Sequence, residues 1–245
     1  RCGQAPRWQG PSGEAGTGIF DVRVHCPDDQ VNRLGGMEDL FAHPAPLEAQ
    51  AIYGLAWLSF GVFHSVFAGV AAKRRLDSLF GVYYRLAYNL WAGLHIAAVW
   101  ALGGALIGDQ PYDLEPGVAG AMTGIGVLGV VVLVLALREY DLGRFSGMAQ
   151  IRAQMKGITL SEDEPLITGG LHQFVRHPLY LGVYLILWGR ATGDFGLATA
   201  VWGSVYLVIG AAFEDRKLLA LYGDEFRGYK DRIPAVIPWR GRVKG

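Results

Sequence analysis

Apolar residues in this chain gather in five stretches, which polar or charged segments separate. The stretches lie at about residues 47–70, 83–107, 117–137, 179–188 and 197–213. A helix needs about 20 mostly apolar residues to cross the hydrocarbon core of a bilayer. The pattern therefore predicts an all-α integral membrane protein with about five transmembrane helices. The last two would form a C-terminal helical hairpin around the turn residues Thr192-Gly193-Asp194.

Three further features refine the expected fold. The fourth stretch is short for a span, so we expect Pro178 to begin it inside a protein-lined cavity, where irregular backbone is tolerated at membrane depth. Residues 214–232 are charged and aromatic, which predicts a cytoplasmic amphipathic helix at the membrane interface. Gly120, Gly124 and Gly126 predict close helix packing, because small residues let membrane helices approach each other.

Lys and Arg are distributed unevenly among the connecting segments. Residues 73–75, 138–156 and 216–244 carry an excess of them, and five spans would place all three segments on one side of the membrane. Loops rich in Lys and Arg usually face the cytoplasm. We therefore expect a multi-pass protein of the lipid bilayer, in a bacterial inner membrane, with its functional site facing the cytoplasm and its N-terminus outside.

The composition excludes several classes of function. Of the 245 residues, 51% are hydrophobic and 18% are charged, and the formal net charge is zero. Nucleic acid is not an expected partner, because its recognition requires a basic surface. Both cysteines, Cys2 and Cys26, lie in the first 36 residues. We therefore expect no disulfide, no metal site and no cysteine nucleophile in the membrane body.

The first 36 residues differ from the rest of the chain. They are polar and Gly-rich, contain proline and show no hydrophobic periodicity. We expect residues 1–36 to be a disordered or non-native extension, with Met37 as the natural start. Residues 37–245 would then form a single membrane domain.

Polar groups converge where the fourth apolar stretch begins. Gly169 and Gly170 free the backbone, Arg176 places a cation beside the imidazole of His177, and Pro178 opens the apolar run. Proline is favoured at the first helical position, so we expect a helix to begin there with Arg176 and His177 at its N-terminus. A helix N-terminus is a natural anion site. The alternative is that Arg176 is only an interfacial anchor.

The motifs downstream favour the functional interpretation. Residues 176–182 read RHPLYLG and follow the pattern RHPxYxG, and after the hairpin come Glu214-Asp215, Tyr222-Gly223 and a closing Pro234 to Pro238. This order resembles the C-terminal half of the membrane methyltransferases typified by isoprenylcysteine carboxyl methyltransferase. It is also similar to bacterial phospholipid N-methyltransferases, methanethiol S-methyltransferases and NnrU-like proteins.

The resemblance covers about residues 135–239, which would be the cofactor half of the domain. One departure concerns the acidic pair, which is often Glu-Glu in these proteins. Here it is Glu214-Asp215, and an Asp side chain is one methylene shorter than Glu. The geometry around Asp215 is therefore expected to differ from the family pattern.

The resemblance implies a methyltransferase that uses S-adenosyl-L-methionine. The expected cofactor-binding residues are Gly169, Gly170, His172, Arg176, His177, Tyr180, Gly182, Glu214 and Asp215. Arg176 would pair with the carboxylate of the cofactor, because its planar fork matches that group. Glu214 and Asp215 would take the ammonium group or the ribose hydroxyls.

The remaining residues of this set complete the expected site. His177 and Tyr180 would form a hydrogen-bonding and stacking wall, and Gly182 would leave room opposite it. His177 and Arg176 are the expected catalytic residues. His177 would act as a ligand or as the base that deprotonates the acceptor, because its ordinary pKa is near neutrality.

The sequence does not identify the methyl acceptor. Small thiols, prenylcysteine carboxylates and lipids would all use the same cofactor half, and a lipophilic acceptor would enter from the bilayer. Acceptor choice is expected to lie in the first two helices. His64 in the first of them is either a functional group at membrane depth or an interfacial residue capped by Ser65 or by a backbone carbonyl.

Two other classes of function are considered. One is an NADPH-dependent membrane reductase of the sterol-reductase type. Its HPNYxGE pattern has Asn and Glu where this chain has Leu179 and Val183. The other is a non-enzymatic, NnrU-like membrane accessory protein.

Overall fold

The computed structural model describes residues 46–158, 160 and 165–240. The chain divides into two units, residues 1–42 and 43–245, and all the described residues belong to the second. The extension expected at residues 1–36 lies outside the described part of the chain. In that part all the regular secondary structure is helical, apart from a single isolated β-bridge between Pro111 and Gly193.

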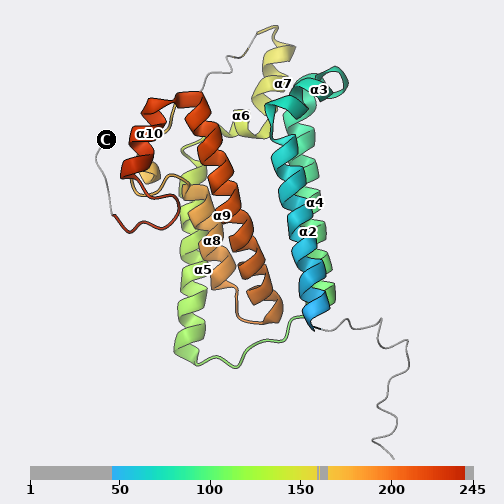
Figure 1. Ribbon diagram of the computed structural model, residues 1–245, viewed down its shortest axis with the longest axis vertical. Coiled ribbons are helices and arrows are strands. Elements are labelled where there is room, and N and C mark those ends of the chain that lie inside the picture. Colours follow the sequence, from blue (N-terminus) through green and yellow to red (C-terminus); the bar gives the residue numbers. More distant parts are fainter. Residues whose placement is uncertain (1–45, 159, 161–164, 241–245) are drawn as a thin grey trace, which may run out of the picture. The chain divides into compact units, whose positions relative to one another are not determined.

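Five helices account for the five apolar stretches (Figure 1). They are α2 (Pro46–Phe67), α4 (Tyr84–Ile107), α5 (Pro116–Leu137), α8 (Pro178–Gly189) and α9 (Asp194–Tyr222). By length and apolar composition, three described stretches are able to cross a membrane: Ala71–Ile107, Pro116–Leu137 and Asp194–Tyr222. Helix α8 is apolar but has only 12 residues. The prediction of an all-α integral membrane protein is confirmed.

Shorter helices lie between and after these five. They are α3 (Val70–Phe80), α6 (Leu142–Ser146), α7 (Met148–Met155) and α10 (Asp224–Arg232), with short 3₁₀ turns η2 (Gly81–Tyr83) and η3 (Gly170–Gln173). The polar stretch 138–177, between the third and fourth apolar stretches, therefore contains α6, α7 and η3. Asp141 explains the start of α6, because its side chain accepts a hydrogen bond from the backbone N–H of Arg144 at 3.0 Å.

The boundary expected at Glu214 is wrong. Helix α9 continues without a break from Asp194 to Tyr222, so residues 214–222 extend the last apolar helix instead of opening a separate amphipathic one. The helix ends at Gly223, which has a φ of +57° that favours glycine, and α10 starts at Asp224. Glu214 and Asp215 therefore lie on a rigid helix, and only residues 224–232 form the charged C-terminal helix.

Helices α2, α4 and α9 pack around an aromatic core. Its buried members are Tyr53, Trp57, Phe60, Val99 and Ala198. The hydroxyl groups of Tyr53 on α2 and Thr199 on α9 share a hydrogen bond of 2.9 Å, so a buried polar group is satisfied across two helices. A Cβ atom on Gly103 of α4 would collide with the ring of Tyr53. Glycine at this position allows α4 to approach α2.

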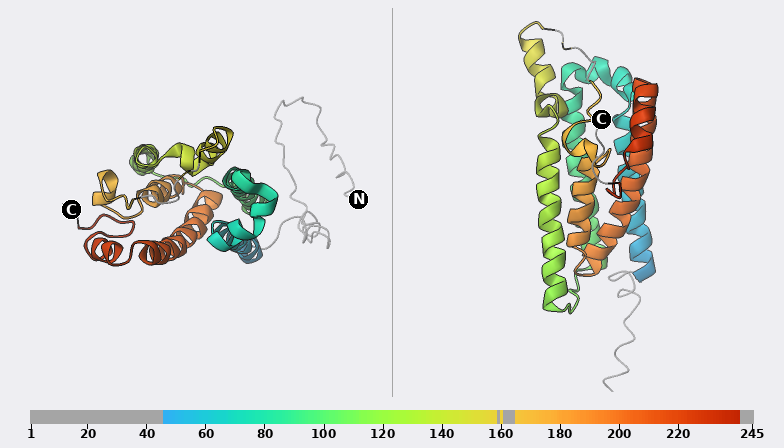
Figure 2. Two further views of the ribbon diagram at one scale, coloured as in Figure 1. Left: turned by 90° about the horizontal axis from the view of Figure 1, so that it is seen from above. Right: turned by 90° about the vertical axis from the view of Figure 1, so that its left-hand side faces the viewer.

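Helix α8 packs between α5 and α9, as Figure 2 shows from two sides. The contact with α5 is made by glycines on both helices: a Cβ on Gly182 would lie 2.8 Å from the backbone N of Leu133, and one on Gly189 would collide with Gly126. The expected packing role of Gly126 is therefore confirmed. Gly120 and Gly124 have no neighbour within 4 Å of an added Cβ, so their expected packing role is wrong within the described chain.

A small cluster fixes the C-terminal segment. Phe226, Tyr229 and Ile233 are buried there, with Leu218 and Tyr222 of α9 among the residues packed against them. This cluster anchors α10 to the end of α9. It thereby holds residues 234 and 235 beside the segment that precedes α8, where the candidate site lies.

Candidate functional site

His177 stands at the N-terminal end of α8, directly before Pro178, as the sequence predicts. The backbone N–H groups of Arg176 and His177 donate to the carbonyls of Pro234 and Ala235, at 2.8 and 2.9 Å. These two bonds join the start of α8 to the C-terminal segment. His177 is buried, with 4% of its surface exposed, so its imidazole is held inside the protein.

Asp215 is the centre of the charged cluster at this site. Its carboxylate accepts from Nε and Nη2 of Arg176 at 3.3 and 2.7 Å, and from Nε2 of His177 at 2.9 Å. Nζ of Lys230 lies 3.2 Å from Oδ2 of the same group. A buried carboxylate is costly unless it is paired and hydrogen-bonded, and Asp215 meets both conditions.

Arg176 is committed to the protein. Besides Asp215, its Nη1 donates to the carbonyl of Lys230 at 3.2 Å and to the carbonyl of Ile233. Only 8% of the side chain is exposed. The expectation that this guanidinium is open to a cofactor carboxylate therefore does not match the structure, because a buried Asp side chain already occupies its fork. For the same reason Asp215 is not open to an ammonium group or to ribose hydroxyls.

Glu214 is the more accessible member of the acidic pair. Its side chain is 42% exposed, and Oε2 lies 3.5 Å from Nδ1 of His177. The two ring nitrogens of His177 thus face two different carboxylates, one buried and one half-open. A neutral imidazole donates from one nitrogen only, so a neutral His177 donates to one of the two carboxylates at a time.

Tyr180 completes one wall of the site. Its ring stacks on the imidazole of His177, with centroids 5.3 Å apart and an angle of 21° between the planes. An added Cβ on Gly210 of α9 would lie 3.6 Å from the Tyr180 hydroxyl oxygen. Gly210 is one helical turn before Glu214, so the hydroxyl lies on the same side of α9 as this carboxylate. The expected wall of His177 and Tyr180 is present.

A second polar network lies behind this wall. Glu139, just after α5, accepts from the backbone N–H of Leu171 at 2.7 Å and contacts Nδ1 of His172 at 2.6 Å. Nε2 of His172 lies 3.2 Å from the hydroxyl of Tyr140, and the carbonyl of His172 accepts from Tyr229 at 2.7 Å. The network connects the end of α5 to η3 and α10.

Burial decides the protonation state of this network. It lowers the pKa of His172, although the hydrogen bond to the Glu139 carboxylate acts in the opposite direction. A neutral His172 donates from Nδ1 to Glu139 and accepts at Nε2 from the Tyr140 hydroxyl. Burial also raises the pKa of Tyr140, and the nearby Glu214 and Glu139 carboxylates raise it further. Tyr140 therefore stays protonated and able to donate.

The two glycines before η3 have different roles. Gly170 has a φ of +54°, and an added Cβ would collide with the carboxylate of Glu139, so glycine is needed for both reasons. Gly169 has an ordinary φ of −85° and no atom within 4 Å of an added Cβ. Its surface is therefore open beside the site.

The structure corrects the role predicted for Gly182. It is buried against the backbone of Leu133 in α5, so the room expected opposite the wall is filled by a neighbouring helix. Sequence reasoning also missed Glu139 and Lys230. The signal for Glu139 is its position, since Glu139-Tyr140 follows the third apolar stretch immediately. No sequence signal distinguishes Lys230 from the other cations of the C-terminal segment.

The chain is similar in sequence to several known proteins. The chain is 26% identical to a methanethiol S-methyltransferase of Mycobacterium tuberculosis over 204 residues, which is 81% of this chain and 82% of the relative. It is 43% identical over 74 residues to methanethiol S-methyltransferase 1 of Bradyrhizobium diazoefficiens. It is 32% identical over 91 residues to protein-S-isoprenylcysteine O-methyltransferase of Mus musculus. The chain is thus similar to methyltransferases of methanethiol and of isoprenylcysteine, the group that its motifs resemble.

The extent of these matches differs. The alignment covers 30% of this chain and 26% of the Bradyrhizobium protein, and 34% of this chain and 31% of the mouse protein. The chain thus spans well under half the length of several of the relatives it matches. No family profile matches the chain, and no solved structure matches it.

The described residues also bear on metal binding. No group of three or more His, Cys, Asp or Glu side chains that could hold a metal ion occurs among them. The polar groups of the site instead form the two networks described above, around Asp215 and around Glu139.

Proposed function

We propose that this protein is an integral-membrane methyltransferase that uses S-adenosyl-L-methionine and methylates a small thiol or another lipophilic acceptor. Its relatives are named as methyltransferases of methanethiol and of isoprenylcysteine. One observation carries the proposal. The His177 ring lies at the N-terminal end of the apolar helix α8, between the buried Asp215 and the half-exposed Glu214.

The donor groups of the site suit a zwitterionic, adenosyl-bearing sulfonium. Glu214 is the carboxylate with exposed surface, so we assign it to the ammonium group or the ribose hydroxyls. Lys230, whose side chain is 43% exposed, is the cation open to the cofactor carboxylate, in place of Arg176. The open side of Gly169 allows close approach of the backbone, and the Tyr180 ring, which stacks on His177, provides a flat wall for the adenosyl group.

When bound, S-adenosylmethionine supplies an activated methyl group and a neutral thioether leaving group, so the protein needs no nucleophile of its own. The task of the residues is to position the reactants, and effective molarity can contribute about 7 to 11 kcal/mol to such a reaction. The buried His177 would hold or move a proton at Nδ1, beside Glu214. Arg176 acts as a positioning residue through Asp215, and His172 holds the Glu139 carboxylate that accepts from the backbone N–H of Leu171.

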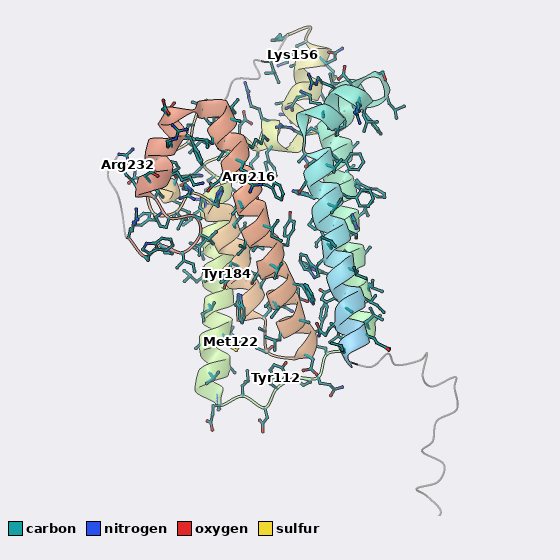
Figure 3. All side chains as sticks on the ribbon, in the orientation of Figure 1. Tyr112, Met122, Lys156, Tyr184, Arg216 and Arg232 are labelled. Carbon is teal, nitrogen blue, oxygen red and sulfur yellow. The ribbon has the colours of Figure 1, made fainter. Side chains whose placement is uncertain are left out.

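The arrangement of charges supports a cytoplasmic site. Lys156, Arg216 and Arg232 lie at one end of the helices and Tyr112 at the other, as Figure 3 shows. Basic ends of membrane helices usually face the cytoplasm. We therefore place the site of this bacterial-type protein at the inner face of the inner membrane, and an acceptor would reach it from the bilayer.

Ligand-dependent thermal stability tests this proposal. The full chain is purified in detergent and heated with S-adenosylhomocysteine, with NADPH or with neither. S-adenosylhomocysteine is expected to raise the apparent melting temperature, because a ligand that binds only the folded state stabilises it. Stabilisation by NADPH alone would support a reductase instead. No response to either ligand would contradict both enzyme assignments.

A further inference from the structure

The sequence left His64 of α2 as either a functional group or an interfacial residue capped by Ser65 or by a backbone carbonyl. The structure gives its ring another partner. The hydroxyl of Tyr88 on α4 lies 2.9 Å from Nδ1 of His64 and 3.2 Å from Nε2. Within the described chain neither Ser65 nor a backbone carbonyl bonds to this ring, so the expected cap is wrong. The imidazole is partly exposed.

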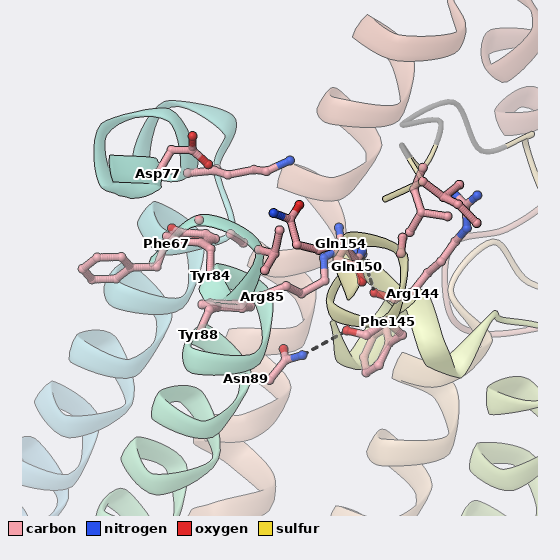
Figure 4. Close-up of a pocket in the computed structure, with 18 of the residues that line it drawn as sticks. Phe67, Asp77, Tyr84, Arg85, Tyr88, Asn89, Arg144, Phe145, Gln150 and Gln154 are labelled. Carbon is pink, nitrogen blue, oxygen red and sulfur yellow. Dashed lines mark hydrogen bonds between the residues drawn. The ribbon is translucent and has the colours of Figure 1, made fainter. Parts of the chain in front are cut away.

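Hydrogen bonds along α4 fix the position of Tyr88. Tyr84, one helical turn earlier, donates from its hydroxyl to the carbonyl of Phe67 at the end of α2, at 2.8 Å. Nδ2 of Asn89 donates to the carbonyl of Phe145 in α6 at 2.9 Å, a bond drawn as a dashed line in Figure 4. These bonds hold α4 against α2 and α6, and they thereby hold Tyr88 beside α2.

Tyr206, in the middle of α9, faces His64 from a third helix. Its ring meets the imidazole edge-on, with centroids 6.1 Å apart and an angle of 80° between the planes. The Tyr206 side chain is partly exposed, and its hydroxyl has no hydrogen-bond partner in the part of the chain that the structure describes. An unpaired polar group is costly where water is scarce. This hydroxyl is therefore available to a ligand.

Glu214 connects these groups to the candidate cofactor site. Its carboxylate acts electrostatically on the imidazole of His64 and on the hydroxyl of Tyr206, and it accepts a hydrogen bond from Tyr180. Gly210, halfway between Tyr206 and Glu214 along α9, would place an added Cβ 3.6 Å from the Tyr180 hydroxyl oxygen. His64 and Tyr206 thus lie within electrostatic reach of the carboxylate that we assign to the cofactor.

His64 differs from the two histidines of the candidate site because it has no carboxylate partner. His177 lies between the two members of the acidic pair, and His172 contacts Glu139 at 2.6 Å. Among the described residues, the Tyr88 hydroxyl is the only hydrogen-bond partner of the His64 ring. Imidazole gains and loses a proton near neutral pH. His64 is therefore the histidine whose ring is available to take a proton from a ligand.

We propose that His64 is the base that takes the proton of a small thiol acceptor, and that the Tyr206 hydroxyl donates a hydrogen bond to the acceptor sulfur. This inference rests on the proposed function. A base is needed because the thiolate, not the thiol, is the nucleophile. A carboxylate acceptor is already ionised at neutral pH and needs no base, so this arrangement favours a thiol.

The step balances as follows. The S–H bond of the acceptor breaks, and its proton passes to the imidazole of His64. The sulfur electron pair forms a bond to the methyl carbon, while the bond from that carbon to the sulfonium breaks and leaves its electron pair on the departing thioether. The partly exposed imidazole then releases the proton to solvent.

The chain offers two test variants and a matched control. His64→Gln removes the base. His95→Gln is the control, because His95 of α4 packs on the same Phe60 ring as His64 and is hydrogen-bonded to Ser59 at 3.1 Å. Tyr206→Phe keeps the ring and removes a hydroxyl that bonds to nothing among the described residues, so this variant is expected to fold like the parent.

Methyl transfer by the purified full chain is measured with two thiols at pH 7. Ethanethiol is mostly protonated at this pH, and 4-nitrothiophenol is already ionised. We expect His64→Gln to lower kcat/KM for ethanethiol by at least about a hundredfold and for 4-nitrothiophenol by less than about threefold, because only ethanethiol needs a base. His95→Gln is expected to match the parent with both thiols.

Binding without turnover is the second readout. The visible absorption of 4-nitrothiophenolate reports its binding to the chain saturated with S-adenosylhomocysteine. Tyr206→Phe is expected to weaken this binding about tenfold, since a hydrogen bond to a charged group is lost. The affinity for S-adenosylhomocysteine should stay that of the parent. If His64→Gln does not fold, this readout decides the inference.

Each of four outcomes would overturn the inference. An equal loss with both thiols in His64→Gln would indicate a structural role instead of proton transfer. An unchanged kcat/KM for ethanethiol in His64→Gln, or unchanged thiol binding in Tyr206→Phe, would place the acceptor elsewhere. A parent that binds S-adenosylhomocysteine but methylates neither thiol would exclude a thiol acceptor and leave the cofactor assignment standing. A parent that does not bind S-adenosylhomocysteine would instead contradict the proposed function itself.

Discussion

Arg176 and Asp215 form a two-point ion pair inside the protein, and only 8% of each side chain is exposed. Arg176 comes from the segment before α8, and Asp215 lies 39 residues later on α9. The pair holds the two helices of the C-terminal hairpin in register at the site. Its burial means that Arg176 supports the fold before it supports any ligand.

Replacing Arg176 with Ala is therefore expected to destabilise the protein. Breaking a buried ion pair by removing one partner typically costs about 3 to 5 kcal/mol, because the other charge is left unpaired. The apparent melting temperature of the detergent-solubilised variant should fall clearly. Arg227→Ala is the control, since its ion pair with Asp224 is exposed on both sides. Equal melting temperatures for the parent and Arg176→Ala would show that Arg176 is only an interfacial anchor.

Gly170→Ala is expected to disrupt the segment before α8, and Gly169→Ala is not. A left-handed backbone costs an L-residue about 1 to 2 kcal/mol, and the new Cβ would also displace the Glu139 carboxylate. Gly169 has space for a methyl group. Binding of S-adenosylhomocysteine should weaken in the first variant more than in the second. Equal affinities of the two variants for S-adenosylhomocysteine would show that the Glu139 network does not support the site.

Stability is expected to fall in mildly acidic solution because of His172. Burial lowers its folded-state pKa below the unfolded value of about 6.5, so the unfolded chain binds more protons as the pH falls through that value. The apparent melting temperature should decrease below about pH 6.5, and His172→Gln should reduce this dependence. A parent and a variant with the same pH profile would show that His172 does not titrate differently on unfolding.

Gly182→Ala is expected to force α8 away from α5. The new methyl group would lie 2.8 Å from the backbone N of Leu133, and overpacking of this kind costs about 1 to 3 kcal/mol. Gly124→Ala in α5 is the matched control, because nothing lies within 4 Å of its added Cβ. The melting temperatures of the two variants should differ. Equal melting temperatures for Gly182→Ala and Gly124→Ala would mean that α8 and α5 separate easily, which contradicts their close packing.

Much of the fold could be predicted from the hydrophobic pattern, because apolar stretches of membrane length dictate helices. Pro178 marked the start of α8 for a local reason, the loss of a backbone N–H that the first helical turn does not use. The end of α9 could not be placed in this way. Residues 214–222 are polar enough to suggest a new helix, but no glycine or proline interrupts them before Gly223.

The sequence indicated which candidate residues lie close together, but not the contacts that they make. The motifs indicated Arg176, His177, Tyr180, Glu214 and Asp215, and the structure brings them together. The sequence alone does not reveal which acidic residue is buried, because that depends on how α9 is rotated against α8. The same limit applies to Gly182, whose neighbour Leu133 lies in another helix.

Equilibrium binding of S-adenosylhomocysteine to the purified full chain, compared with Glu214→Gln, tests the central claim most directly. Losing one partner of a charged hydrogen bond in a partly buried site costs on the order of 2 to 5 kcal/mol. Because each 1.4 kcal/mol is about a factor of ten, we predict at least about a tenfold loss of affinity, with the melting temperature of the unliganded protein unchanged. Glu225→Gln, a change at an exposed residue of α10, should bind like the parent. Affinity of Glu214→Gln within about threefold of the parent, in folded protein, would contradict the cofactor site proposed here.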